Sequence, residues 1–504
     1  MALSPFRRLP LDILQEIALW SPPETPSHRR TDVPVSLSQV SSGWRTAVLS
    51  LPTIWARLEY DTYGDNHEPG KLSRLLEQFF SKARDQPLSL SLGLSSGWSV
   101  KTKADYDLKL SRSRQALAEA MHGCPLIVSL RHLSISSAFP MPLLVQEPIH
   151  LPQLESLVLT NERRRRRPAS DQGLWTHHIL KNNHKLRSLL VDHSILGSDA
   201  AHLLAPWTNA LTHFSFAQVM QPSEWLDFLN AAPNLQSGYF HVSGSLPLPD
   251  ITPTHAQLEE LTLVFRRINP ESFKLWKAFR FSRVRHLTIK FPEDPRRDHG
   301  AGPPWHGQYH LDANFPNLQV LTFDEPWNSR IFFPEFCQHN PGLLELRIAM
   351  PVSLCGALFT RLSLLPEGDP SQTHGQLLPR ITNLTVLAST WGPGTGVIPL
   401  KHLAMMETML ESRVNPLPKD GQCSTIYKLQ SFRLICVLGV QEEVRNELRS
   451  ELERIQDKFQ APELSISVDF QYPAHDILCP VPLGHSEEFS LELLGTGNFE
   501  DQLE

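Results

Sequence analysis

The apolar positions of this chain follow one recurring pattern from residue 130 onward. An apolar residue is followed by two other positions, a second apolar residue, one further position and a third apolar residue. Clear copies are "LRHLSI" at 130–135, "LEELTL" at 258–263 and "LQVLTF" at 318–323. Apolar residues at every second position are typical of a strand with a buried face. The other copies begin at residues 154, 186, 211, 284, 343, 381 and 429, and a weaker one comprises Leu235, Gly238 and Phe240.

Amphipathic stretches lie between these strands, and most neighbouring copies are about 23–26 residues apart. We expect helices at 173–182, 223–232, 271–279, 332–340 and 401–410. A strand, a loop and a helix at this period are typical of a leucine-rich repeat solenoid. Any single copy would also fit an ordinary buried strand, but so many copies in register favour the solenoid. The copies are irregular, because no fixed asparagine follows the last apolar position.

The two ends of the array carry patterns of their own. At 71–94 a helical stripe precedes a strand with leucine at every second position, which predicts a capping unit that joins the front of the chain to the array. At the other end, 441–459 predicts a helix and 464–470 predicts a last strand. We therefore divide the chain into a helical module at 1–60, a linker and capping unit at 61–125, the repeat array at 126–438, a helix and strand cap at 439–483, and an acidic tail at 484–504 that we expect to be disordered.

The first residues predict two short amphipathic helices with a proline-rich loop between them. In "LPLDILQEIALW" at 9–20, apolar residues recur at helical spacing, and Pro10 suits a first helical turn. Residues 21–34 contain four prolines and predict a loop, and a second helical stripe follows at 37–48. Two short helices are too small to bury their own apolar surface. That surface therefore packs on the following domain or on a partner protein, and the pattern leaves both open.

The stretches "LPLDILQEI" and "LSQVSSGWRTAVLSLPTIW" together resemble an F-box, with a leading Leu-Pro, an acidic residue two positions on and a Val…Trp-Arg…Trp tail. The resemblance covers residues 6–56, and the loop at 21–34 is longer than the usual link, as in F-box-like proteins of mushroom-forming fungi. The repeats resemble the degenerate ones of F-box leucine-rich-repeat proteins. The resemblance implies docking to the small adaptor of a cullin-RING ubiquitin ligase. The adaptor contacts that it implies are Leu9, Pro10, Ile13, Ile17, Val40, Trp44, Leu51, Pro52 and Trp55.

Composition narrows the class of protein further. The formal net charge of −6 argues against general nucleic-acid binding, and we expect no specific nucleic-acid partner. No apolar run approaches the length of a membrane-spanning helix, so we expect no membrane association. The six cysteines form no CxxC pair, which favours reduced thiols and a cytoplasmic or nuclear location.

Motifs for catalysis or metal binding are weak. Residues 93–97 spell G-x-S-x-G after a strand, but the continuation is a poor start for the helix that a nucleophile elbow needs. The loop "GPGTG" at 392–396 lacks the lysine of a phosphate-binding loop. His177-His178, His184 and Cys337-x-His339 show no paired ligand spacing. We therefore expect no enzymatic activity, no metal and no cofactor.

Five consecutive arginines at 163–167 are the strongest charge feature. Five like charges cannot be buried together, so the run predicts a loop after the strand at 154–159. A solvated loop, a nuclear-import signal and a contact for an acidic partner are all compatible with it.

Taken together, the patterns predict an α/β fold in which a small helical F-box-like module precedes an irregular leucine-rich-repeat solenoid, with a parallel sheet and helices on its outer face. Its expected role is substrate recognition within an SCF-type cullin-RING ubiquitin ligase, and the alternative is a repeat scaffold unconnected to ubiquitin. A scaffold cap would bury Leu9, Ile13, Trp44 and Trp55, whereas a docking module would leave an apolar patch. The target protein is unknown, and the candidate target contacts are Glu155, Arg187, His213, Glu259, Arg285, Glu345 and Asn383.

Overall fold

A computed structural model of the 504-residue chain defines its fold. The residues that the structure describes are 9–20, 32–61, 70–94, 102–137, 139, 144–145, 149–161, 183–191, 207–243, 257–267, 281–290, 315–324, 340, 342–363, 378–389, 400–414, 427–437, 442–459 and 464–471.

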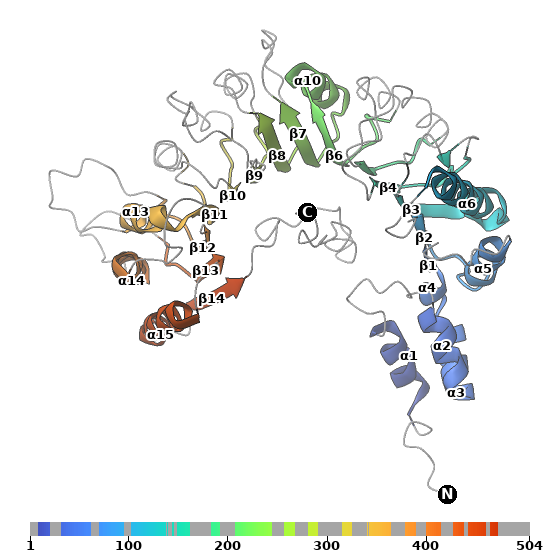
Figure 1. Ribbon diagram of the computed structural model, residues 1–504, viewed down its shortest axis with the longest axis horizontal. Coiled ribbons are helices and arrows are strands. Elements are labelled where there is room, and N and C mark those ends of the chain that lie inside the picture. The colour runs from blue at the N-terminus through green and yellow to red at the C-terminus, as the bar shows by residue number, and fades with distance from the viewer. Residues whose placement is uncertain are drawn as a thin grey trace, which may run out of the picture. The chain divides into compact units, whose positions relative to one another are not determined.

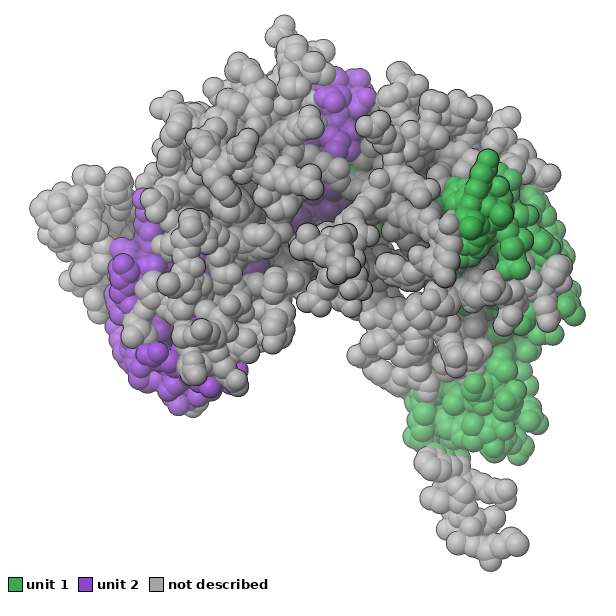
Figure 2. Space-filling model, in the orientation of Figure 1, with its two compact units in different colours: residues 1–218, 483–504 green, residues 219–482 purple. Residues whose placement is uncertain are grey.

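The chain divides into two compact units, residues 1–218 with 483–504 and residues 219–482 (Figure 2). In each unit the strands follow chain order, and neighbouring strands within a unit pair in parallel. The first unit holds β1 (Arg57–Asp61), β2 (Leu88–Leu94), β3 (Leu130–Ser137), β4 (Ser156–Asn161), β5 (Ser188–Val191) and β6 (His213–Met220), whose last two residues lie beyond the boundary. The second holds β7 (Ser237–Ser243), β8 (Glu260–Arg267), β9 (His286–Lys290), β10 (Val320–Asp324), β11 (Glu345–Pro351), β12 (Asn383–Ser389), β13 (Ser431–Val437) and β14 (Ser465–Gln471).

Helices accompany the strands on one side of each sheet (Figure 1). In the first unit these are α5 (Lys71–Phe80) and α6 (Lys103–His122), with a 3-10 turn at Pro125–Ser129. The helices α1 (Leu11–Trp20), α2 (Asp32–Val40), α3 (Ser42–Leu49) and α4 (Pro52–Trp55) precede β1 in the chain and lie together beyond it. In the second unit the accompanying helices are α10 (Pro222–Ala231), α13 (Val352–Leu362), α14 (Leu400–Val414) and α15 (Glu442–Lys458). The predicted fold class, an α/β repeat array with a parallel sheet, is confirmed.

The strand register explains the apolar repeat. The second apolar position of each copy pairs with that of the next, as in Leu346 with Leu384 and Leu384 with Phe432. These side chains are at most 2% exposed, so each repeat completes its core with side chains of its neighbours. The first apolar position belongs to the turn before the strand, where the N–H of Leu154 donates to the carbonyl of Leu151. Each array strand therefore begins about two residues after the start of its pattern, except for β3, which begins at Leu130.

Every predicted strand is present, and two of the five helices predicted between the repeats are seen as α10 and α14. The predicted helices at 173–182 and 271–279, and nearly all of that at 332–340, lie outside the described residues. The helices predicted at 71–94 and 441–459 correspond to α5 and α15. The sequence patterns did not predict β1, α6 or α13. The strand β1 overlaps the end of the range assigned to the helical module. Its alternation of polar and apolar residues covers only five residues, which is too short to stand out in the sequence.

The front of the chain differs from the expectation of two helices. The stripe at 37–48 is divided at Ser41, whose side chain accepts a hydrogen bond from the Trp44 N–H and caps α3. The helix α2 starts at Asp32, inside the stretch predicted as a loop. Pro34 is compatible with this start because the first turn of a helix needs no backbone donor from it.

The helix α5 joins the front helices to the sheet, as its capping pattern predicts. Trp55 from α4 packs edge-on against Phe79 of α5, with ring centroids 5.1 Å apart. The Lys82 Nζ lies 3.9 Å from the centre of the Trp55 ring, and the Trp55 Nε1 donates to the Val48 carbonyl at 2.9 Å. These contacts hold α4 against both α3 and α5.

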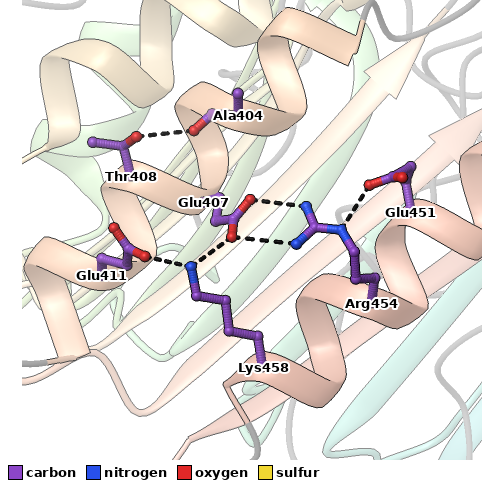
Figure 3. Close-up of polar contacts among 7 residues, drawn as sticks. All are labelled: Ala404, Glu407, Thr408, Glu411, Glu451, Arg454 and Lys458. Atoms are coloured by element: carbon purple, nitrogen blue, oxygen red, sulfur yellow. Dashed lines mark hydrogen bonds and ion pairs between the residues drawn. The ribbon is translucent and has the colours of Figure 1, made fainter.

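In the second unit, packing and charge both connect the outer helices. Gly356 of α13 lies against the His402 ring of α14, and an added Cβ would be 2.4 Å from that ring. Arg413, at the end of α14, is buried and donates to two backbone carbonyls. Between α14 and α15, Glu407 pairs with both Arg454 and Lys458 (Figure 3). Contacts of this kind fix three successive helices over β11 to β14.

Candidate functional site

The front helices pack on one another through a narrow apolar seam. Leu14 and Ala18 of α1 are buried, and the Leu14 Cδ1 approaches the Gly43 position at the start of α3. The Gln15 Nε2 also donates to the Ser50 Oγ at 2.8 Å. The seam therefore uses a different face of α1 from the stripe of Ile13 and Ile17.

That other stripe faces solvent. Ile13 is 42% exposed and Ile17 is 39% exposed, and their spacing of four residues places them on one face of α1. Val40, at the end of α2, is 63% exposed. The remaining large exposed apolar residues of this region are Leu11, Leu19, Val35 and Leu49. A single exposed leucine is ordinary, whereas several exposed apolar side chains gathered within four short helices are typical of surfaces that bind a partner.

The structure separates the nine predicted adaptor contacts into three groups by exposure. Pro10, Ile13, Ile17 and Val40 are exposed, and Leu9, Leu51 and Pro52 are half-buried. Trp44 and Trp55 instead belong to the core of the first unit and leave little exposed surface for a partner. The Trp55 ring is covered by Phe79 of α5, and α3, which carries Trp44, packs on α1 and α2, which helical spacing alone does not reveal.

The seven candidate target contacts lie along the start of the strands. Glu155, Arg187, Glu259 and Arg285 immediately precede β4, β5, β8 and β9, and their carbonyls accept backbone N–H groups from the following repeat. His213, Glu345 and Asn383 are instead the first residues of their strands. Arg187, Glu259 and Arg285 are exposed, while the other four are half-buried.

Several of these charges are already paired with neighbours. Glu155 lies 3.3 Å from the Arg131 guanidinium, and the Glu345 carboxylate accepts from the Arg347 Nε at 2.6 Å. Exposed pairs of this kind contribute little stability, but they reduce the charge that either partner offers to a target. On β3, burial lowers the pKa of the His132 imidazole, so His132 is neutral at pH 7.

The candidate target contacts chosen from the sequence do not include one row of residues on the sheet face opposite the helices. Arg347 and Arg433 occupy the position between the second and third apolar residues of their repeats, which points away from the buried leucines. The alternation of the repeat could have identified them, because it assigns that position to this face in every copy.

No arrangement for catalysis emerges among the described residues. Gly93 lies within β2 beside the Asp61 carboxylate, and residues 95–97 of the G-x-S-x-G sequence are outside the described part. No group of three or more metal-ligating side chains is present in the described ranges. The arginine run at 163–167, His177-His178 and the loop at 392–396 also fall outside them.

The fold and its surfaces define an α/β repeat protein with a small helical module at its front. No family model and no curated protein matches the chain. Among solved structures, the complex of TLR13 with ssRNA13 is similar over 63% of this chain and 40% of that one, at 15% identity and a TM-score of 0.32. The complex of Rad7 and Elc1 in yeast is similar over 82% of this chain and 77% of that one, at 9% identity and a TM-score of 0.30. Within the described residues, no helix has the length and apolar character needed to cross a bilayer.

Proposed function

We propose that this protein is the substrate-recognition subunit of an SCF-type cullin-RING ubiquitin ligase. The front helices would bind the small adaptor of the ligase, and the repeat array would bind a target protein. The stripe of Ile13 and Ile17 carries the proposal, because it lies within the motif that resembles an F-box and its two side chains are 42% and 39% exposed.

The energetics of this stripe suit a docking contact. About two-fifths of each isoleucine is exposed, so covering the pair contributes on the order of 1 kcal/mol per side chain. Val40 adds a third exposed apolar side chain from the end of α2. A few central side chains account for most of the binding energy at a protein interface, so a small apolar face is sufficient for docking.

The proposed role requires no chemistry from the chain itself. By holding target and adaptor together, the protein raises the effective concentration of target lysines near the ubiquitin-charged enzyme. The proposal therefore includes no catalytic residue, cofactor, specific nucleic acid or membrane contact, and it places the protein in the cytoplasm or the nucleus.

A binding measurement with purified adaptor tests the docking face. The double variant Ile13→Asp/Ile17→Asp should bind the adaptor at least about tenfold more weakly, because two charges would have to be desolvated in an apolar contact. Leu108→Asp is the matched control, since Leu108 is 51% exposed on α6, outside the front helices. The control should bind as the native chain does, and both variants should retain the native circular dichroism spectrum.

Substitution of Trp44 is unsuitable for this test because the buried ring supports the fold. Failure of the native protein to bind the adaptor would contradict the proposal. Equal binding by the native chain and the double variant would also contradict the assignment of this face.

A repeat scaffold unconnected to ubiquitin is the second candidate. It is favoured by the burial of Trp44 and Trp55 and by the contact of Trp55 with Phe79, which a structural cap would also make. In that case the native chain would not bind the adaptor, whereas the Trp55→Ala variant would lose thermal stability as the cap detached from α5.

A further inference from the structure

Three polar side chains form a row across the middle of the second unit's sheet. The register pairs Arg347 of β11 with Thr385 of β12, and Thr385 with Arg433 of β13. Adjacent strands are about 4.8 Å apart, so the two arginine backbones are about 10 Å apart with the threonine between them. Two arginine side chains at this separation can reach one small anion above Thr385.

This row faces away from the helices. The neighbouring residues Leu346 and Phe432 are buried, and the Phe432 ring contacts Phe359 of α13. Because successive side chains alternate between the faces of a strand, Arg347 and Arg433 point to the face opposite the helices. Arg433 is exposed, and the Arg347 side chain is 39% exposed.

The donors in the row are suited to an anion. Glu345 accepts a hydrogen bond from the Arg347 Nε, which orients the guanidinium and leaves its two terminal Nη groups without another contact in the described ranges. Thr385 contributes a hydroxyl, and Asn383 and Ser431 lie in the adjacent row of the register. Paired guanidinium groups with nearby hydroxyls match the several acceptor oxygens of a phosphate.

The charges select the type of anion. Glu345 cancels part of the positive charge of the row and repels any anion. A ligand with one carboxylate therefore gains little binding energy at this row. A phosphate monoester carries about −1.5 to −2 charge at pH 7 and gains correspondingly more from two guanidinium groups.

The surroundings argue for one phosphate and against a nucleic-acid backbone. In the same register, the equivalent positions of β8, β9 and β10 are Thr262, Thr288 and Thr322. Positive charge along this row therefore occurs only at two residues within the described part of β8 to β13. A nucleic-acid strand would need cations along its path to compensate successive phosphates.

We propose that the row of Arg347, Thr385 and Arg433 binds a phosphate monoester carried by a protein segment. As a feature of a ligase target this rests on the proposed function, whereas phosphate binding itself needs only the second unit.

The test uses the full chain without any adaptor, so its outcome is separate from that of the docking experiment. The probes are two fluorescent peptide pools of random sequence, one with a central phosphoserine and one with serine. The phosphoserine pool should bind more tightly than the serine pool, and added salt should weaken it. Arg347→Gln and Arg433→Gln should each reduce binding about tenfold or more, as loss of a charged hydrogen bond does.

Arg361→Gln is the matched control, because Arg361 is an exposed arginine of α13 on the helix side of the sheet. This variant should bind the phosphoserine pool as the native chain does. Equal binding of both pools, or unchanged binding by both arginine variants, would overturn the proposal. Binding of a single-stranded RNA oligonucleotide that is lost in the same two variants, with no preference for phosphoserine, would overturn it in favour of a nucleic-acid ligand.

Discussion

Arg413 shows how one residue can support a whole interface. Its side chain is 1% exposed, its Nε donates to the Leu362 carbonyl at 2.8 Å, and its Nη1 donates to the Leu378 carbonyl at 2.7 Å. Leu362 ends α13, and Leu378 has a left-handed backbone with φ of 52° before β12. The arginine thereby gives the helix-end carbonyl of Leu362 a donor and adds a second donor to the Leu378 carbonyl, which also accepts from the Ile381 N–H.

We expect Arg413→Met to lower the free energy of unfolding of the second unit by about 2–4 kcal/mol, because two buried hydrogen bonds from a charged group are lost and the Leu362 carbonyl is left without its guanidinium donor. Denaturation followed by circular dichroism measures the change. Arg361→Met is the control and should remain within about 0.5 kcal/mol of the native chain, since Arg361 is exposed. A native-like midpoint for Arg413→Met would show that water replaces the guanidinium at no cost.

At the scale of elements, charge fixes α15 on α14. The Arg454 Nη2 donates to the Glu407 carboxylate at 2.9 Å and the Lys458 Nζ donates to it at 2.6 Å (Figure 3). Hydrogen bonds from Arg454, then from Lys458, lower the pKa of Glu407 from 4.5 to about 2. The carboxylate is therefore more easily ionised in the folded protein than in the unfolded chain.

The lowered pKa of Glu407 predicts a specific pH dependence. Its stabilising contribution is fully present above the unfolded pKa of 4.5 and is lost as the pH falls toward 2. The thermal midpoint of the native chain should fall over this range, and Glu407→Gln should show a smaller fall. Glu447→Gln removes one exposed carboxylate from α15 and serves as the control. Identical pH profiles for Glu407→Gln and the native chain would contradict the assigned role of the pair.

At the scale of the whole molecule, each strand pairs with the strands that precede and follow it in the chain, so the stability of the array is approximately the sum of contacts between neighbouring repeats. Leu346 of β11 is fully buried and is paired in register with Leu321 of β10 and Leu384 of β12. A defect there acts first on the adjacent strands, since each repeat contacts mainly its neighbours. The division into two compact units further separates β2 to β4 from such a defect.

We expect Leu346→Asp to remove hydrogen-exchange protection from β10 to β13 while β2 to β4 keep theirs, because an isolated buried carboxylate cannot be accommodated in that core. Mass spectrometry of the exchanged peptides measures both regions in one sample. Ser431→Ala, on the face of β13 opposite the helices, should leave protection unchanged throughout. Equal loss of protection in both units would mean that the chain unfolds as a single cooperative block.

Much of the fold could be predicted from the spacing of apolar residues along the chain, whereas the exposure of the candidate binding residues could be predicted only in part. The alternation in the repeats locates every array strand because a strand with one buried face must place apolar residues at every second position. The helix α6 escaped prediction because its buried side includes Ser113 and several alanines, which give a weak apolar stripe. Among the candidate contacts, the exposure of Ile13 and Ile17 fits the pattern, but the burial of Trp44 and Trp55 does not.

The sequence by itself determined the repeat, the parallel α/β architecture and the helical module at the front, because local spacing fixes which face of each element is apolar. The tertiary structure decided which apolar faces stay uncovered and which charges meet. Glu407 and Lys458 are 51 residues apart, and Arg347 and Thr385 become neighbours only through the sheet register. Burial and pairing depend on neighbours brought together by folding, and spacing along the chain does not contain that information.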